Sequence, residues 1–253
     1  MANTKLIAGN WKMNGLSEDS LPRARKIADF ADKNKAALKD KAAVLIAPPA
    51  TLLSGLSGVT KSSPVFLGAQ DCHPETSGAF TGNLSAEMLK DAGCSYIITG
   101  HSERRTIHGE SSELVAAKAA ATHRAGMTAI ICVGETAAQR QAGEAEKTVK
   151  AQIMQSLPDT VLAGNTVIAY EPVWAIGTGL TATTEDIEAM HNFIRALLQK
   201  KFPAIAETHL LYGGSVKGAN AKQILSLSNV DGVLVGGASL NGQEFCDIIA
   251  AAL

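Results

Sequence analysis

Short runs of apolar residues recur along the 253-residue chain, and the longer segments between them mix polar and apolar positions. A short continuous apolar run is typical of a strand that is buried on both faces, as in a parallel sheet. The pattern therefore predicts eight parallel strands. The runs are Leu6–Trp11, Ala43–Ala47, Val65–Ala69, Tyr96–Thr99, Ala129–Val133, Val167–Tyr170, His209–Tyr212 and Gly232–Val235.

The segments between the runs have the spacing of helices. Ser111–Ala125 is rich in alanine, begins with serine and is followed by Gly126, which is a common stop signal. Thr184–Lys201 repeats apolar residues at helical spacing and ends in two lysines, which favour a helix C-terminus. Strands that alternate with helices predict a (β/α)₈ TIM barrel, formed as a single catalytic domain by residues 1–253.

A doubly wound sheet is the alternative fold for such a pattern. Its dinucleotide-binding version carries Gly-x-Gly-x-x-Gly after the first strand, and this motif does not follow Leu6–Trp11. The barrel is therefore favoured.

Composition narrows the class of protein. The 23 Lys+Arg nearly balance the 24 Asp+Glu, which argues against a nucleic-acid or anionic-membrane partner. The cysteines show no Cys-x-x-Cys spacing, and no apolar core of a signal peptide follows the first residue, so we expect reduced thiols and a cytoplasmic location. The six histidines are scattered, and their spacing implies no metal site.

Polar residues follow the strands at their carboxyl ends, which in a parallel barrel meet at one mouth. Lys12 follows the first strand, His101 and Glu103 follow the fourth, and Glu171 follows the sixth. One lysine, one histidine and two carboxylates are thereby predicted to converge on the mouth.

The segment after the sixth strand has an unusual order of residues. Glu171 and Pro172 end the strand, the apolar tip Val173–Ile176 follows, and Gly177–Gly179 completes the segment. An apolar loop suits a lid that excludes water, and a carboxylate at its root would have a raised pKa, as a general base needs. The alternative is an ordinary connector with a solvated glutamate.

Five motifs stand in order along the chain: Gly9–Asn14, Gly100–Arg105, Ala169–Gly179, Tyr212–Val216 and Asp231–Ser239. In these motifs the chain resembles the triosephosphate isomerase family, and the resemblance covers essentially its full length. That resemblance implies a (β/α)₈ barrel that interconverts dihydroxyacetone phosphate and glyceraldehyde 3-phosphate through an enediol(ate), in glycolysis and gluconeogenesis, without a cofactor.

The resemblance also implies roles for individual residues. Glu171 is expected to be the base. His101 is expected to donate as a neutral imidazole, with a pKa lowered by the helix N-terminus that it opens. Lys12 is expected to stabilise the developing oxyanion, Asn10 to be its polar partner in the site, and Glu103 to be a carboxylate near the lysine.

A phosphate site is implied at the ends of the last two strands. By resemblance, Gly177, Ser215, Gly236 and Gly237 donate to the substrate phosphate, and glycine lets backbone N–H groups come close to an anion. The alternative is plain turn chemistry, since paired glycines are common in loops. Cys132, at the end of the fifth strand, is interpreted as a packing residue and not as a nucleophile.

The loop Gln70–Leu84 is too long to be a plain connector. By resemblance it inserts into a second copy of the chain to form a homodimer, and Thr81 at its tip supports the neighbour's site. Asn83 stands where the family usually has glutamate, and His108 where it usually has a bulky aromatic residue. Both departures bear on the strength of the subunit contact.

Other phosphosugar barrels and a catalytically silent binding barrel are the competing interpretations. An aldolase would need a Schiff-base lysine deep in the barrel, and strands two to eight contain no lysine. A metal-dependent epimerase would need clustered histidine and aspartate ligands. A silent barrel would be expected to lack the base, the histidine or the lysine, and all three are present.

Overall fold

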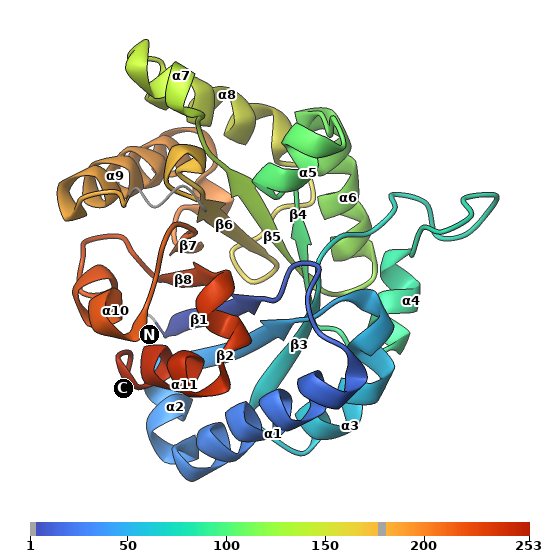
Figure 1. Cartoon of the computed structure of the whole chain (residues 1–253). Coiled ribbons are helices and arrows are strands. Elements are labelled where there is room, and N and C mark those ends of the chain that lie inside the picture. Colours follow the sequence, from blue (N-terminus) through green and yellow to red (C-terminus); the bar gives the residue numbers. More distant parts are fainter. Residues whose placement is uncertain (1–3, 177–180) are drawn as a thin grey trace.

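The described part of the computed structural model, residues 4–176 and 181–253, contains a closed barrel of parallel strands. The strands follow one another around the barrel in chain order, and helices surround them (Figure 1). The strands are β1 (Lys5–Asn10), β2 (Ala42–Ala47), β3 (Val65–Ala69), β4 (Tyr96–Thr99), β5 (Thr128–Val133), β6 (Thr166–Tyr170), β7 (His209–Tyr212) and β8 (Gly232–Val235).

Helices connect the strands on the outside of the barrel. The α-helices are α1 (Ser17–Lys33), α2 (Lys35–Lys41), α3 (Leu53–Lys61), α4 (Ala86–Asp91), α5 (Ser102–Ile107), α6 (Ser112–Arg124), α7 (Ala137–Gln141), α8 (Ala145–Ser156), α9 (Thr184–Lys201), α10 (Gly218–Leu225) and α11 (Gly242–Ala250). Short 3₁₀ helices are η1 (Ala50–Leu52), η2 (Val173–Ala175), η3 (Pro203–Ile205) and η4 (Gly237–Leu240). None of the described helices is long and apolar enough to cross a membrane.

The predicted fold class is confirmed, and the predicted elements agree closely with those observed. The helix predicted at Thr184–Lys201 has those bounds, and Ser111 caps α6 by accepting a hydrogen bond from the backbone N–H of Leu114 at 3.2 Å. Trp11, predicted as the last residue of the first strand, lies just beyond β1. It is fully buried, so its apolar character reflects burial and not strand geometry.

Two layers of buried residues explain why the strands are apolar throughout. Alternate residues such as Leu6 and Ala8 point into the barrel and pack with Leu45 and Ile130. The residues between them, such as Ile7, point outward to the helices. Both faces of each strand are therefore buried, as the continuous apolar runs predict.

The barrel closes where β1 pairs with β8, from Leu6 opposite Gly232 to Gly9 opposite Val235. Gly232 has a φ of 153°, and a Cβ atom there would lie 2.0 Å from the carbonyl oxygen of Leu6. Closure in this register therefore requires glycine at position 232.

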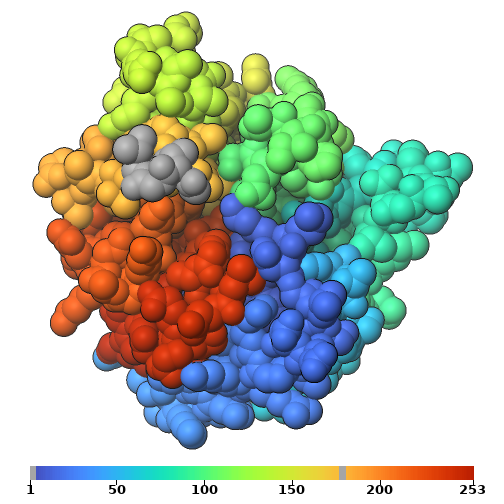
Figure 2. Space-filling model, viewed as in Figure 1, coloured from blue at the N-terminus to red at the C-terminus, as the bar shows by residue number. Residues whose placement is uncertain are grey.

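The connection between β3 and α4 stands out from the barrel. Figure 1 shows it as a long loop beside α4, and Figure 2 shows it projecting from the molecular surface. Phe80 and Leu84 in this loop are 40% and 37% exposed. The loop therefore offers apolar side chains away from the chain's own core.

Candidate active site

A cavity of about 410 Å³ opens at the carboxyl ends of the strands. Glu103 lies beside it and lines a neighbouring cavity. Gly177, a predicted phosphate donor, falls outside the described residues. The predicted site residues that line the cavity are Asn10, Lys12, His101, Glu171, Ser215, Gly236 and Gly237.

The carboxylate of Glu171 is buried, with the residue only 2% exposed. It accepts hydrogen bonds from the Ser102 backbone N–H at 2.9 Å and the Ser102 hydroxyl at 3.1 Å, and His101 Nε2 lies 2.9 Å from Oε1. A Cβ at position 213 would lie 2.9 Å from its Cγ, so Gly213 leaves the space that the side chain occupies. The carboxylate is therefore enclosed and fully partnered in this arrangement.

Burial acts to raise the pKa of Glu171, but His101 and the two donors of Ser102 outweigh it. The net pKa lies below its ordinary value of 4.5. The sequence-based expectation of a raised pKa is wrong for this arrangement, because it counted the desolvation and not the donors.

His101 is the N-cap residue of α5. Its Nδ1 accepts a hydrogen bond from the Glu103 backbone N–H at 3.2 Å, so in the neutral ring the proton is on Nε2, which faces Glu171. Burial acts to lower the pKa of His101, but the Glu171 carboxylate outweighs it, and the net pKa lies above 6.5. The expected lowering is wrong here, since a carboxylate in direct contact outweighs burial and the helix N-terminus together.

Lys12 has a left-handed backbone with a φ of 52°. This conformation costs roughly 1–2 kcal/mol in a residue other than glycine. The Lys12 N–H donates to Asn10 Oδ1 at 2.9 Å, and Gln70 Nε2 donates to its carbonyl oxygen at 2.8 Å. Nζ lies 2.5 Å from Glu103 Oε1. Asn10 and Gln70 therefore fix the backbone of Lys12, and Glu103 holds its ammonium group beside the cavity.

The ends of β7 and β8 form the opposite wall of the cavity. A Cβ at position 236 would lie 3.3 Å from Lys12 Cε, so Gly236 lets the lysine side chain pass close to the backbone. The Ser215 hydroxyl donates to the carbonyl oxygen of Ala175 at 3.2 Å and so joins this wall to the segment after Glu171.

The described part of the predicted lid begins with η2. The indole N–H of Trp174 donates to Glu135 Oε1 at 2.8 Å, the Tyr170 hydroxyl donates to the same oxygen at 3.0 Å, and the Arg140 guanidinium lies 4.5 Å from the Trp174 ring centre. Glu135 anchors this segment although the sequence analysis gave it no role. Cys132 is fully buried, and burial raises the pKa of its thiol well above 9, which fits packing.

Ser102 and Gln70 are also functional neighbours that the sequence analysis did not assign. Ser102 follows His101 directly, so the same motif offered a signal for it. Gln70 follows β3, at the same end of the barrel as the other site residues.

These groups are suited to acid–base chemistry with charge stabilisation. A buried carboxylate, an imidazole and an ammonium group face one cavity. Across residues 4–176 and 181–253, no three or more His, Cys, Asp or Glu residues are grouped so that they could hold a metal ion. The fold and the site together define a barrel enzyme of the acid–base class.

Comparisons with known proteins give the family. The triosephosphate isomerase sequence profile matches residues 5–252. The triosephosphate isomerase of Bradyrhizobium diazoefficiens is 50% identical over 244 residues, covering 96% of this chain and 95% of that protein. That of Chelativorans sp. is 54% identical over 247 residues, covering 97% and 96%. The crystal structure of the Bartonella henselae triosephosphate isomerase has a TM-score of 0.88, 44% identity and 98% coverage of both chains. The chain belongs to the triosephosphate isomerase family and is an isomerase.

Proposed function

We propose that this chain interconverts dihydroxyacetone phosphate and glyceraldehyde 3-phosphate, with Glu171 moving a proton between adjacent carbons. The observation that carries the proposal is a carboxylate only 2% exposed at the cavity that His101 and Lys12 also line. A cavity of about 410 Å³ is also of the size expected for a small ligand.

The reaction requires the contact between Glu171 and His101 to open. A substrate carbonyl oxygen that accepts the Nε2–H of His101 takes that donor away from the carboxylate. The pKa of Glu171 then rises because the part of the offset to burial that His101 supplies is lost, and the carboxylate becomes a stronger base toward carbon. His101 meanwhile polarises the carbonyl as a neutral donor.

The remaining residues hold charge. Lys12 stabilises the developing enediolate oxygen, Asn10 and Glu103 keep Lys12 in place, and a site shielded from bulk water strengthens these interactions. The phosphate group is bound at the ends of β7 and β8, where Ser215, Gly236 and Gly237 line the cavity. Gly177 is a further proposed donor, which lies outside the described residues. The reaction needs no cofactor.

Replacement of Glu171 by Asp tests the role of the base. The shorter side chain displaces the carboxylate, and a displacement of about 1 Å costs on the order of 100-fold in rate. We expect kcat to fall by about this factor in a coupled triosephosphate assay, with the Ki of inorganic phosphate unchanged. Glu207→Asp, at an exposed glutamate, is the matched control. Near-normal turnover of Glu171→Asp would remove Glu171 from its role.

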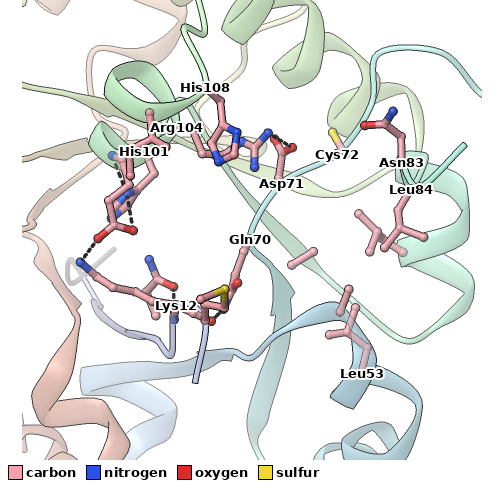
Figure 3. Close-up of a pocket in the computed structure, with 18 of the residues that line it drawn as sticks. Lys12, Leu53, Gln70, Asp71, Cys72, Asn83, Leu84, His101, Arg104 and His108 are labelled. Carbon is pink, nitrogen blue, oxygen red and sulfur yellow. Dashed lines mark hydrogen bonds and ion pairs between the residues drawn. The ribbon is translucent and has the colours of Figure 1, made fainter. Parts of the chain in front are cut away.

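We also propose that the chain forms a homodimer through the loop Gln70–Leu84. Support comes from a second cavity, of about 760 Å³, next to the site and bordered by Lys12 and His101 (Figure 3). Met13 and Ile107, which also line it, are 94% and 74% exposed. Exposed apolar side chains around a cavity are typical of an interaction surface. The exposed tip residue Thr81 of the partner's loop would then lie near this site.

Two residues of this region are already engaged within the chain. Cys72 is 3% exposed, so it packs within its own chain and is not part of the apolar loop surface. Arg104 pairs with its own Asp71 at 2.9 Å and Glu110 at 2.5 Å. Asn83 therefore leaves no unpaired charge on Arg104. His108 is exposed beside the same cavity.

Sedimentation at low micromolar concentration tests the assembly. We expect a dimer for the unchanged chain and monomers for Phe80→Asp, because an ionised side chain at an apolar contact is strongly unfavourable. Leu162→Asp, at an exposed leucine away from the loop, is the control and should remain a dimer. A fully active monomer would overturn the assembly and the role of Thr81.

The proposed location is the cytoplasm. The described cysteines are all free and buried, which suits a compartment that keeps thiols reduced.

A further inference from the structure

The side chain of Gln152, in the middle of α8, makes two hydrogen bonds to one residue at the end of β5. Its Nε2 donates to the carbonyl oxygen of Gly134 at 2.9 Å, and its Oε1 accepts from the Gly134 N–H at 2.7 Å. An uncharged side-chain amide provides a donor and an acceptor in one plane, which suits this paired contact. Both backbone polar groups of Gly134 are therefore fixed by one side chain.

Gly134 in turn lies against the backbone of Glu171. A Cβ atom on Gly134 would fall 1.7 Å from the carbonyl oxygen of Glu171 and 2.7 Å from its carbonyl carbon. On either side of Gly134, the carbonyl of Val133 accepts from the Glu171 N–H at 2.8 Å, and that of Glu135 accepts from the Val173 N–H at 3.1 Å. The path of residues 133–135 therefore sets the path of residues 171–173.

Arg105 makes a second set of contacts at the same end of β5. Arg105 of α5 donates from Nη2 to the carbonyl oxygen of Cys132 at 3.2 Å and to the Ser156 hydroxyl at 3.0 Å. Helix α8 thus contacts the end of β5 directly through Gln152 and indirectly through Ser156. This makes the position of α8 relevant to the geometry of the site.

We propose that Gln152 is a positioning residue for the base. It holds the Gly134 peptide, and through it the backbone from which the Glu171 side chain extends. The proposal rests on the proposed role of Glu171. Gln152 does not line the cavity of about 410 Å³ but a separate one of about 150 Å³, which it shares with Gly134 and Glu171. It therefore acts on the reaction through other residues.

Loss of the two hydrogen bonds between Gln152 and Gly134 has a specific expected effect. Glycine has the widest conformational range of any residue, so the Gly134 peptide gains freedom when its two partners are removed. The carboxylate of Glu171 is carried at the end of a side chain, where a small backbone shift displaces it. The hydrogen bonds described for Gln152 go to Gly134 and not to Ser215, Gly236 or Gly237 at the ends of β7 and β8. Turnover should therefore fall while phosphate binding persists.

The principal test is Gln152→Met, which keeps the length of the side chain and removes both hydrogen bonds. We expect kcat to fall by roughly 10- to 100-fold, in line with a displacement of up to about 1 Å. The KM and the Ki of inorganic phosphate should stay within about twofold of the unchanged chain, as expected when only interactions of the transition state are lost. Gln155→Met, at an exposed glutamine of the same helix, is the matched control and should change neither.

Isotope effects separate positioning from a loss of folded protein. If the base is misplaced, proton transfer becomes more rate-limiting, and the primary deuterium effect on kcat increases for substrate deuterated at the transferred position. A purely structural defect lowers the fraction of active protein and leaves that effect unchanged. An unchanged kcat and isotope effect in Gln152→Met would overturn the proposal.

Gln152→Glu gives a second test, which can still be carried out if Gln152→Met fails to fold. A protonated carboxyl can donate to the Gly134 carbonyl and accept from its N–H, whereas a carboxylate cannot donate. The ratio of variant to unchanged kcat should therefore rise as pH falls, with thermal melting run at each pH to verify folding. The titratable groups that line the cavity of about 150 Å³ beside Gln152 are Arg105, Cys132 and Glu171. All three are present in the variant and in the unchanged chain. A ratio that does not change with pH would contradict the role of the two Gln152–Gly134 hydrogen bonds.

Glu171→Gln in the same assays distinguishes the two proposals. If it retains turnover, the assignment of the base fails. If it is inactive while the Gln152 variants behave like the unchanged chain, only the positioning role fails.

Discussion

The contact between Glu171 and His101 stabilises the ligand-free protein in a defined pH range. The pKa of Glu171 lies below 4.5, so its contribution to stability is complete above that pH and is lost as pH falls through the lowered pKa. The pKa of His101 lies above 6.5, so its contribution is complete below that pH and is lost as pH rises through the raised pKa. Both statements describe one contact, so they are a single contribution to stability. That contribution is largest between about pH 4.5 and 6.5.

We predict that NMR titration of the ligand-free protein gives His101 a pKa above 6.5. In Glu171→Gln the pKa of His101 should fall, because the carboxylate that raises it is gone. His191 serves as an internal control, since burial lowers its pKa to about 4 and it lies outside the site. A His101 pKa that is the same in both proteins would show that Glu171 does not control it.

At the scale of elements, a buried ion network joins α5 and α6 to the segment after β3. Lys118 Nζ of α6 lies 2.6 Å from Asp71 Oδ1 and 2.5 Å from Glu110 Oε1. Arg104 of α5 contacts the same two carboxylates. Removal of Lys118 leaves the two carboxylates with a single cation, so one negative charge of the network is uncompensated.

We predict that Lys118→Met lowers the free energy of unfolding by about 3–5 kcal/mol, the range for breaking a buried ion pair. Denaturant unfolding measures the change. The matched control is Lys147→Met, because the pair that Lys147 forms with Glu144 is at the surface, and it should have little effect. Equal stability of the two variants would show that the network is not stabilising.

The elements were more predictable from sequence than the contacts between them. Continuous apolar runs predict strands because each strand is buried on both faces, and Thr184–Lys201 was predicted with its observed bounds because its apolar spacing and terminal residues agree. The donors to Glu171 come from residues 101 and 102, about 70 positions away, and Gln152 lies within a helix with no local signal of its target. Such pairings depend on the closed barrel, which brings distant strand ends together. The predicted pKa shifts of Glu171 and His101 were wrong for the same reason, because they depend on contacts between distant strand ends.

At the scale of the whole molecule, the four cysteines are buried in different parts of the fold. Burial raises the pKa of Cys72 and Cys94 to about 12 and that of Cys246 to about 11. Since the thiolate is the reactive form, the folded protein should react slowly with thiol reagents.

We predict that a chromogenic disulfide reagent near pH 8 labels the native protein slowly and labels four thiols at once in denaturant. Destabilised Lys118→Met should be labelled faster than the unchanged chain, because labelling of a buried thiol requires opening. Fast stoichiometric labelling of the native protein would contradict this burial.

The pairing of β1 with β8 also has a consequence for synthesis. β1 is the first strand of the barrel to be translated, and its partner β8 is the last. Throughout most of translation, the nascent sheet therefore has two open edges whose backbone N–H and C=O groups lack their native partners. Open strand edges recruit other chains. For this topology, the two edges can cover one another only when β8 has emerged and paired with β1.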